Sequence, residues 1–306
     1  MVILMKETAV RTKVQANIYD LHQAIQRGQR DVVEQIVEAG SVNLNWAIRG
    51  TTALSLTLYK EKFELFHLML EYHHCKLGLI DLNKLSKDEK QRIETPLITA
   101  CRLNSLSPAE SLLRAGVHLD EVDNYEHTAL WVATRERNID MVRLLIENGA
   151  SVNCRMKWNQ NPLFYATDRA SKRTQLAEYL IQQGADVCID QSRREQPMPL
   201  LVLAAKHNWH FACLLVEVGC HITRAELQQH RSQFQNASWH NDLLQLLQTE
   251  SSSPAPLQRI ARNAIRKNVA QHCGGKFFAC NCLHLPLPKA VIDSILLRDI
   301  LPPSIF

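Results

Sequence analysis

Cysteine and histidine side chains gather in one short stretch of this 306-residue sequence, and both can bind zinc. The stretch contains His272, Cys273, Cys280, Cys282 and His284. Cys280 and Cys282 enclose one residue, whereas paired zinc ligands commonly enclose two or more, and no second pair follows. We therefore predict no metal site. The nine cysteines of the chain are scattered and odd in number, which is typical of free thiols in a reduced intracellular protein.

The signatures of common enzyme sites are missing from the sequence. Neither a Gly-x-Ser-x-Gly nor a His-Glu-x-x-His segment occurs, and ten glycines leave little material for phosphate-binding loops. We therefore expect that the chain is not an enzyme and binds no cofactor. The longest apolar runs, such as Leu200 to Ala205, fall far short of the roughly 20 residues that a membrane-spanning helix needs. We expect a cytoplasmic protein, with the nucleus as the alternative compartment, and no membrane contact.

Positive charge is concentrated in the last part of the chain. Residues 251–306 carry a net charge of +5, against −1 for residues 1–250. Arg259, Arg262, Arg266 and Lys267 could contact phosphates, but no aromatic side chains alternate with them as base stacking requires. We interpret this basic run as the solvated face of a helix, and we predict no nucleic-acid partner.

The elements that position these side chains follow from a repeated six-residue motif, of which Thr128-Ala129-Leu130-Trp131-Val132-Ala133 is one copy. Its leucine recurs at intervals of 33, 43, 33, 33 and 38 residues, at Leu21, Leu54, Leu97, Leu130, Leu163 and Leu201. A small residue follows most of these leucines three positions later. Glycines such as Gly149 stand nineteen residues after the leucine and follow an apolar run, which indicates a helix C-cap. Each unit therefore predicts two short antiparallel helices that stack on their neighbours.

This pattern resembles the ankyrin repeat, whose 33-residue unit has a Thr-Pro-Leu-His-x-Ala core, over about residues 16–222. The resemblance implies an all-α fold, an ankyrin-repeat solenoid of about six repeats. We assign residues 1–15 to an N-terminal segment and residues 16–250 to the solenoid with a terminal cap that starts near Ala225. The longer intervals contain two polar, charged insertions, residues 77–93 and 190–198, which we expect to be surface loops.

A serine- and proline-rich segment then marks a linker at residues 251–255. An amphipathic helix is predicted over residues 257–269, because Leu257, Ile260, Ala261, Ala264 and Ile265 fall on one stripe. Its apolar stripe can equally belong to the core of a small domain. The two prolines of residues 285–288 favour an extended segment, and a second helix is predicted from about Pro288.

Residues 256–298 resemble a SOCS box, which we bound as a small helical domain at 256–306. The whole chain resembles the ankyrin repeat and SOCS box protein family. The family motif Leu-x-x-x-Cys-x-x-x-aliphatic, which docks elongin C, corresponds here to Leu257, Ala261 and Ile265. Ala261 stands where the family has cysteine, a loss of about 1 kcal/mol on the scale of one buried methylene. Residues 271–283, with Gly274 and Gly275, have no assigned role.

The resemblance implies partners for two sets of residues. Elongin C, together with elongin B, is expected to bind Leu257, Ile260, Ala261 and Ile265. A cullin, cullin-5 with its RING protein, is expected to bind the family's Leu-Pro-Leu-Pro motif, which is present unaltered as Leu285, Pro286, Leu287 and Pro288.

Ankyrin stacks usually bind their targets through hairpin tips and the first-helix face. Tyr125 and Trp158 precede two of the motif leucines by five residues, and aromatic side chains anchor interfaces. With Arg135 on the adjoining helix, they form the predicted surface for an unknown target protein. The sequence thus predicts the substrate-recognition adaptor of an elongin B/C–cullin-5 RING ubiquitin ligase. The alternatives are an ankyrin scaffold whose tail only caps the solenoid, and a zinc-containing nucleic-acid adaptor.

Overall fold

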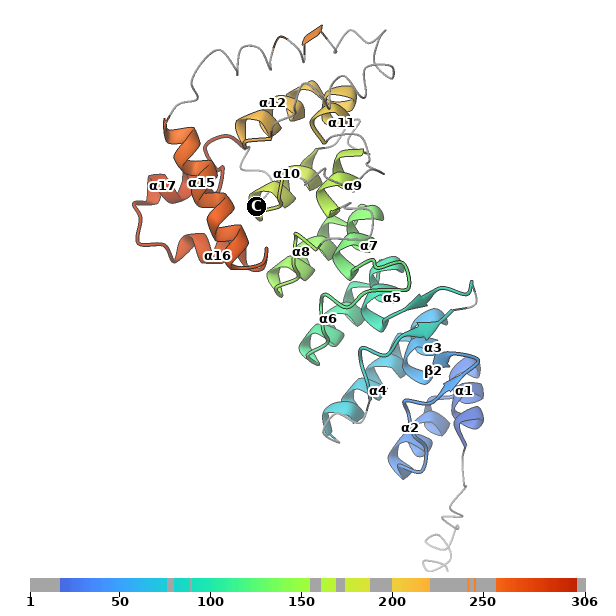
Figure 1. Ribbon diagram of the computed structural model, residues 1–306. Coiled ribbons are helices and arrows are strands. Elements are labelled where there is room, and N and C mark those ends of the chain that lie inside the picture. Colours follow the sequence, from blue (N-terminus) through green and yellow to red (C-terminus); the bar gives the residue numbers. More distant parts are fainter. Residues whose placement is uncertain are drawn as a thin grey trace, which may run out of the picture. The chain divides into compact units, whose positions relative to one another are not determined.

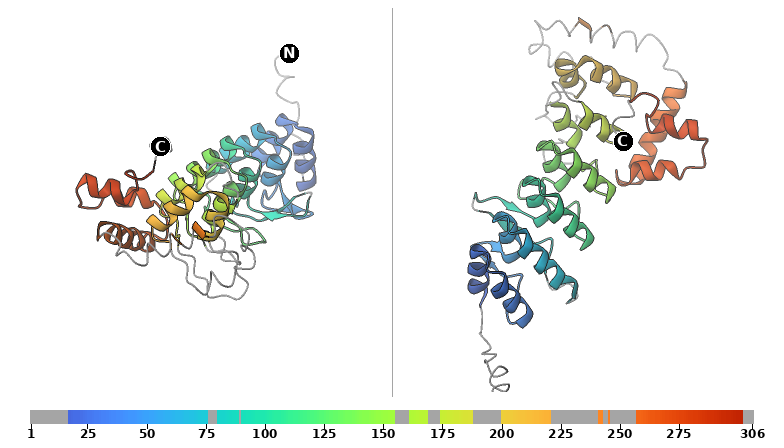
Figure 2. Two further views of the ribbon diagram at one scale, coloured as in Figure 1. Left: turned by 90° about the horizontal axis from the view of Figure 1, so that it is seen from above. Right: turned by 180° about the vertical axis from the view of Figure 1, so that it is seen from behind.

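The computed structural model describes residues 17–75, 80–88, 90–154, 161–168, 174–187, 200–220, 241–242, 245 and 257–301. They fall into two compact units, one within residues 1–124 and the other within residues 125–306, and both are built mainly of short helices (Figures 1 and 2). The predicted N-terminal segment, the linker at 251–255 and the insertion at 190–198 lie outside the described residues, as does most of the predicted cap.

Helix pairs form the first unit. They are α1 (Ile18–Arg27) with α2 (Arg30–Ala39), α3 (Ala53–Tyr59) with α4 (Phe63–Cys75), and α5 (Pro96–Arg102) with α6 (Leu106–Arg114). The motif leucines of these pairs are fully buried, and Thr52 and Thr95 cap α3 and α5 by accepting backbone N–H bonds. The helix starts and the buried leucines agree with the sequence prediction.

The structure is mostly helical, as expected for an all-α repeat solenoid, and it adds two short antiparallel hairpins. In one, β1 (Ala47–Ile48) pairs with β2 (Thr51–Thr52), and in the other β3 (Ser86–Lys87) pairs with β4 (Ile93–Glu94). The second hairpin lies at the end of the first insertion and reaches one residue beyond it. The described part of the insertion is therefore not the surface loop that we expected throughout, because Ile80, Leu82 and Ser86 are buried although Leu85 is exposed. Its charged residues indicated exposure to solvent, but two of them pair with each other, so that one can be buried. A guanidinium nitrogen of Arg92 lies 2.5 Å from the buried Asp88 carboxylate.

The second unit continues the helix pairs and adds a further group of helices. The pairs are α7 (Ala129–Arg135) with α8 (Ile139–Glu147), α9 (Pro162–Asp168) with α10 (Gln175–Gln182), and α11 (Leu200–His207) with α12 (Trp209–Glu217). Gly149, Gly184 and Gly219, just past α8, α10 and α12, have positive φ angles of +94°, +84° and +101°. These values confirm the predicted glycine caps.

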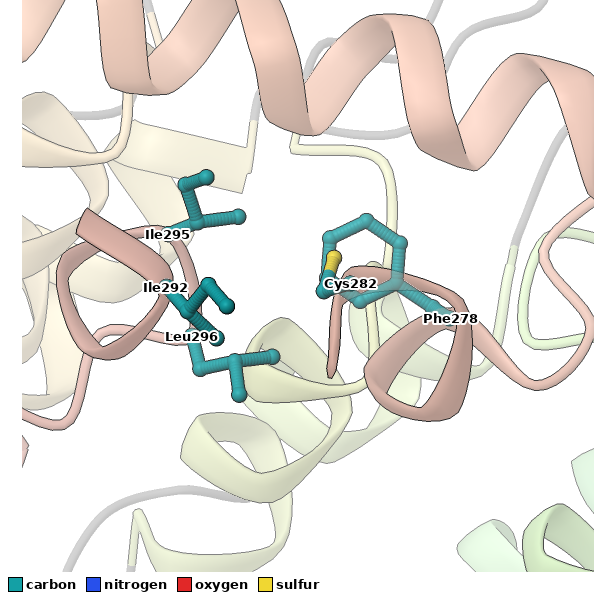
Figure 3. Packing of buried hydrophobic residues seen from close by; sticks show 5 residues of the cluster. All are labelled: Phe278, Cys282, Ile292, Ile295 and Leu296. Carbon is teal, nitrogen blue, oxygen red and sulfur yellow. The ribbon is translucent and has the colours of Figure 1, made fainter. Parts of the chain in front are cut away.

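The C-terminal helix group consists of α15 (Leu257–His272), α16 (Phe278–Leu283) and α17 (Lys289–Ile295), drawn orange to red in Figure 1. These helices share a small buried core, in which the side chains of Phe278 and Cys282 face those of Ile292, Ile295 and Leu296 (Figure 3). Helix α15 runs three residues beyond its predicted end. The segment before α17 is not extended as expected: the Leu287 N–H donates to the Leu285 carbonyl oxygen at 2.8 Å, so the chain bends there.

Candidate functional site

One face of α15 carries apolar side chains that are exposed. Leu257 is 84% exposed and Ile260 53%, and Ala261 and Ala264 are exposed as well. The four residues follow the spacing i, i+3, i+4, i+7, so they lie along one side of the helix. We call this set the apolar stripe. A leucine with most of its surface in water at the start of a helix is costly for a monomer, so the stripe is a candidate binding surface.

The opposite face of α15 carries arginines, and it packs against the second-unit helices rather than facing solvent. Arg262 and Arg266 are each 6% exposed. The Arg262 guanidinium donates to the Glu217 carbonyl oxygen at 2.9 Å and to its carboxylate at 3.2 Å, and Arg259 donates to the same carboxylate at 3.2 Å. These contacts overturn the interpretation of the basic run as a solvated face for its arginines, while Lys267 is exposed as expected.

Arg266 joins three elements through one side chain. Its guanidinium donates to the carbonyl oxygens of Ile181 in α10 and Ile295 in α17, and it lies 5.0 Å from the centre of the Phe278 ring. Both carbonyls belong to the last turns of their helices, where acceptors lack intrahelical partners and the helix dipole attracts a cation. The charge is therefore stabilised although it is buried, and burial lowers the pKa of Arg266 to about 10.

The segment at residues 271–283, which had no predicted role, attaches the C-terminal helix group to the loop after α8. The Ser151 hydroxyl donates to the Gly274 carbonyl oxygen at 2.7 Å, and the Val152 N–H donates to the Gly275 carbonyl oxygen at 3.2 Å. These bonds and the buried arginines hold α15 so that its apolar stripe is left uncovered. No local sequence signal indicates such contacts, because the bonded residues lie more than a hundred positions apart.

Of the residues predicted to contact partners, some pack against the core of the C-terminal helix group and others are exposed to solvent. Ile265 and Leu285 are half-buried and pack against the core of the C-terminal helix group. Pro286, Leu287 and Pro288 are exposed, and Leu283 and Val291 nearby are exposed too. The structure therefore leaves a second exposed apolar region around residues 286–288, separate in sequence from the apolar stripe.

The predicted target surface is only partly within the described residues, because Trp158 lies outside them. Tyr125 is 60% exposed, and its ring lies 5.8 Å from that of His127. His127 stacks on Trp131 with the ring centres 3.7 Å apart, and the Arg135 guanidinium lies 5.2 Å from the Trp131 ring centre. Tyr125 and Arg135 thus belong to one continuous row. Its two middle members, His127 and Trp131, were not predicted from the sequence, although Trp131 directly follows a motif leucine.

The side chains of the cysteine and histidine stretch lie in different environments. Cys282 is fully buried in the core of the C-terminal helix group, while the Cys280 sulfur lies 3.8 Å from the Nδ1 atom of an exposed His284. Over the part of the chain that the structure describes, no three His, Cys, Asp or Glu side chains are placed to hold a metal ion. Within the same ranges, no helix is long and apolar enough to cross a membrane.

Comparison with known families identifies the helix pairs from α5 to α10. The sequence matches the family of ankyrin repeats, in three copies, over residues 75–156 and 97–191. The chain contains ankyrin repeats. Ankyrin repeats stack into solenoids that present extended binding surfaces, so the repeats indicate a role in protein interaction, and repeats of this kind are generally interaction modules rather than catalytic domains.

Curated proteins with similar sequences differ widely in architecture. The chain is 26% identical to Ankyrin repeat and SOCS box protein 16 of Homo sapiens, over 91% of this chain and 66% of that protein. It is 27% identical to the Probable 26S proteasome regulatory subunit p28 of Saccharomyces cerevisiae, over 65% of this chain and 84% of that protein. It is 29% identical to Potassium channel AKT2/3 of Arabidopsis thaliana over 44% of this chain, and it spans only 15% of that channel.

Proposed function

We propose that this chain is the substrate-recognition adaptor of an elongin B/C–cullin-5 RING ubiquitin ligase. The ankyrin repeats bind the target protein, and the C-terminal helix group acts as a SOCS box. The exposed apolar stripe of α15 carries this proposal, because Leu257 and Ile260 face solvent while the arginines on the other face are buried. The human relative named for ankyrin repeats and a SOCS box, which matches 91% of the chain, supports it.

The apolar stripe suits elongin C because an amphipathic helix can place such a row of side chains in a groove of its partner. In the proposed complex Leu257 is the main anchor, with Ile260 and Ala261 beside it. Ile265 already packs against the core of the C-terminal helix group, so it supports the position of α15 and contributes less to the contact. Burying one leucine contributes about 1.5–3 kcal/mol, which makes Leu257 the strongest single determinant of binding.

The cullin surface consists, in this proposal, of Pro286, Leu287 and Pro288. Leu285 belongs to the same four-residue motif, but its side chain packs against the internal core and so acts in folding. The target surface consists of Tyr125 and Arg135, joined through Trp131, with Trp158 as a further predicted member. The chain supplies proximity: tethering raises the effective concentration of target lysines near the ubiquitin-loaded enzyme.

Stepwise assembly from purified components tests the proposal. We expect the full chain to bind elongin B–C, and that complex to bind cullin-5 with its RING protein. Changing Pro286 and Leu287 to alanine, with Leu285 kept, should prevent cullin binding and leave elongin binding within twofold. A full chain that binds no elongin B–C contradicts the adaptor function and favours an ankyrin scaffold whose tail only packs on the repeats. Loss of both partners in the double variant contradicts the assigned division.

A further inference from the structure

Three glycines of the ankyrin repeats each face a side chain of the C-terminal helix group. A Cβ atom placed on Gly149 would lie 2.3 Å from the Phe277 ring, and one on Gly184 would lie 2.4 Å from the Phe278 ring. At Gly219 the nearest atom is the Asn263 amide nitrogen at 3.0 Å. The absence of a side chain at these positions therefore does more than cap a helix, because it lets the C-terminal helix group approach the backbone closely.

The contacts follow one another along the chain in a matched order. Arg259, Arg262 and Asn263 contact Glu217 at the end of α12, and Arg266 contacts Ile181 near the end of α10. Gly274 and Gly275 then contact the residues that follow α8. Between Arg262 and the end of α15 at His272 the helix advances roughly 15 Å, and Gly274 lies two residues further on, which is comparable to two spacings of about 8–10 Å between packed helices. The C-terminal helix group thus meets three successive helix ends.

The backbone at Phe277 is also constrained by these contacts. Its φ angle is +49°, in the left-handed region that bulky side chains rarely adopt. Such a conformation persists only where surrounding contacts hold it. Here the neighbouring Gly275 is fixed by Val152, and the next residue, Phe278, is buried both in the core of the C-terminal helix group and against Gly184.

We propose that these contacts form a rigid dock that sets the direction in which the apolar stripe faces relative to the target-binding ankyrin repeats of the second unit. Phe278 and Arg266 are then positioning residues for ubiquitin transfer, and Phe277 supports them. This role rests on the proposed function, since only a ligase adaptor needs a fixed path from target to cullin. Without the dock, these contacts would no longer hold α15 against the helix ends of the repeats. Target lysines would then sample many positions instead of a restricted set.

Glycine-to-alanine variants of the full chain separate the dock from ordinary backbone strain. Gly116 is a matched control, because its φ angle of +82° equals that of Gly184 within a few degrees while nothing lies within 4 Å of its missing Cβ atom. Gly184→Ala places a methyl group against the root of the buried Phe278 ring. Gly149→Ala meets only the far end of the Phe277 ring, which is 47% exposed and can swing away. We therefore expect the largest effect from Gly184→Ala.

The Val152 amide reports on the dock directly, because its N–H donates to Gly275 of the C-terminal helix group. We expect Gly184→Ala to speed hydrogen exchange at Val152 at least tenfold relative to both the wild type and Gly116→Ala. Arg266→Lys provides a second variant, since it keeps the charge but loses the fork that reaches both carbonyls. Unchanged protection of Val152 in both variants would overturn the dock.

The positioning role is tested on the assembled ligase, with the chain's own lysines as the probe substrate. Wild type and Gly116→Ala should give the same restricted set of ubiquitinated lysines, whereas Gly184→Ala should spread modification over more lysines at an elongin affinity within twofold of wild type. Faster exchange at Val152 with an unchanged lysine pattern overturns the positioning role. If the full chain binds no elongin B–C, the proposed function fails and the positioning role with it, while the exchange measurement still decides whether the dock exists.

Discussion

Replacing Leu257 with alanine tests the proposed elongin contact at the residue that is expected to contribute most to binding. The substitution removes three side-chain carbons, each worth about 0.8 kcal/mol when buried. Because 84% of this residue is exposed in the free chain, nearly all of that surface is available to a partner. The expected loss is therefore about 2 kcal/mol, which corresponds to roughly a 30-fold weaker Kd for elongin B–C.

The measurement is the affinity of the full chain for purified elongin B–C, determined by titration calorimetry or surface-based binding. An exposed side chain contributes little to folding, so Leu257→Ala should change the free energy of unfolding by no more than about 0.5 kcal/mol. Leu85 provides the control, because it is another exposed leucine but lies in the first unit, before β3. Leu85→Ala should leave the Kd unchanged.

A substitution that should strengthen elongin binding provides a second test of the same contact. Ala261 lies on the exposed stripe, at the position where the SOCS-box motif that this helix resembles has cysteine. Ala261→Cys should strengthen binding by about 1 kcal/mol, or roughly fivefold, because it adds one apolar group to the contact. A Leu257→Ala chain that binds within twofold of wild type refutes the docking of this face. So does equal weakening by Leu85→Ala, since the effect would then be unrelated to α15.

Two further predictions concern the ankyrin repeats. Burial lowers the pKa of His22 from 6.5 to about 4, so between these values the unfolded chain binds a proton that the folded chain does not. The free energy of unfolding should therefore fall as the pH drops from 7, by about 2 kcal/mol at pH 5, and urea unfolding should show this loss in wild type but not in His22→Leu. For the target surface, Tyr125→Ala combined with Arg135→Ala should reduce recovery of cross-linked target at least tenfold, whereas Tyr19→Ala, which removes another exposed tyrosine, should not. Equal recovery from the double variant excludes this patch.

The parts of the fold that depend on local pattern could be predicted from the sequence. The motif leucines are buried because each lies in the first turn of a short helix, on the side that faces the neighbouring helices. The threonines before them cap those helices, and the glycines at their ends adopt positive φ angles. Each of these features needs only a few adjacent residues, so a 33-residue period is enough to reveal it.

The first insertion shows why composition alone was misleading. Residues 77–93 are rich in charges, which favours a solvated loop. In the structure Ile80 and Leu82 are buried, and so is Asp88, which pairs with Arg92. Just past the insertion, the buried Glu94 carboxylate lies 2.5 Å from a guanidinium nitrogen of Arg102. Charged side chains that satisfy one another can be buried, and only the spatial arrangement shows which of them do so.

The arginines of α15 were interpreted as solvated because the sequence does not show their partners, as was also true of the charged insertion. Arg266 donates to a carbonyl 85 positions earlier in the chain and to another 29 positions later. A helical pattern records which side chains share a face, but it carries no information on acceptors that other helices bring to that face. The same limitation hid the role of residues 271–283, whose partners lie in the loop after α8.

The orientation of α15 follows from the competition between its two faces. Apolar burial alone would turn Leu257 and Ile260 toward the ankyrin repeats and leave the arginines in water. The Glu217 carbonyl and carboxylate at the end of α12, and the Ile181 carbonyl near the end of α10, however, accept hydrogen bonds from guanidinium groups, which an apolar face cannot supply. The glycines there leave room for that approach. Once the arginines are bound inside, the apolar stripe must face outward, and the most economical explanation of an outward leucine on a firmly held helix is a partner that covers it.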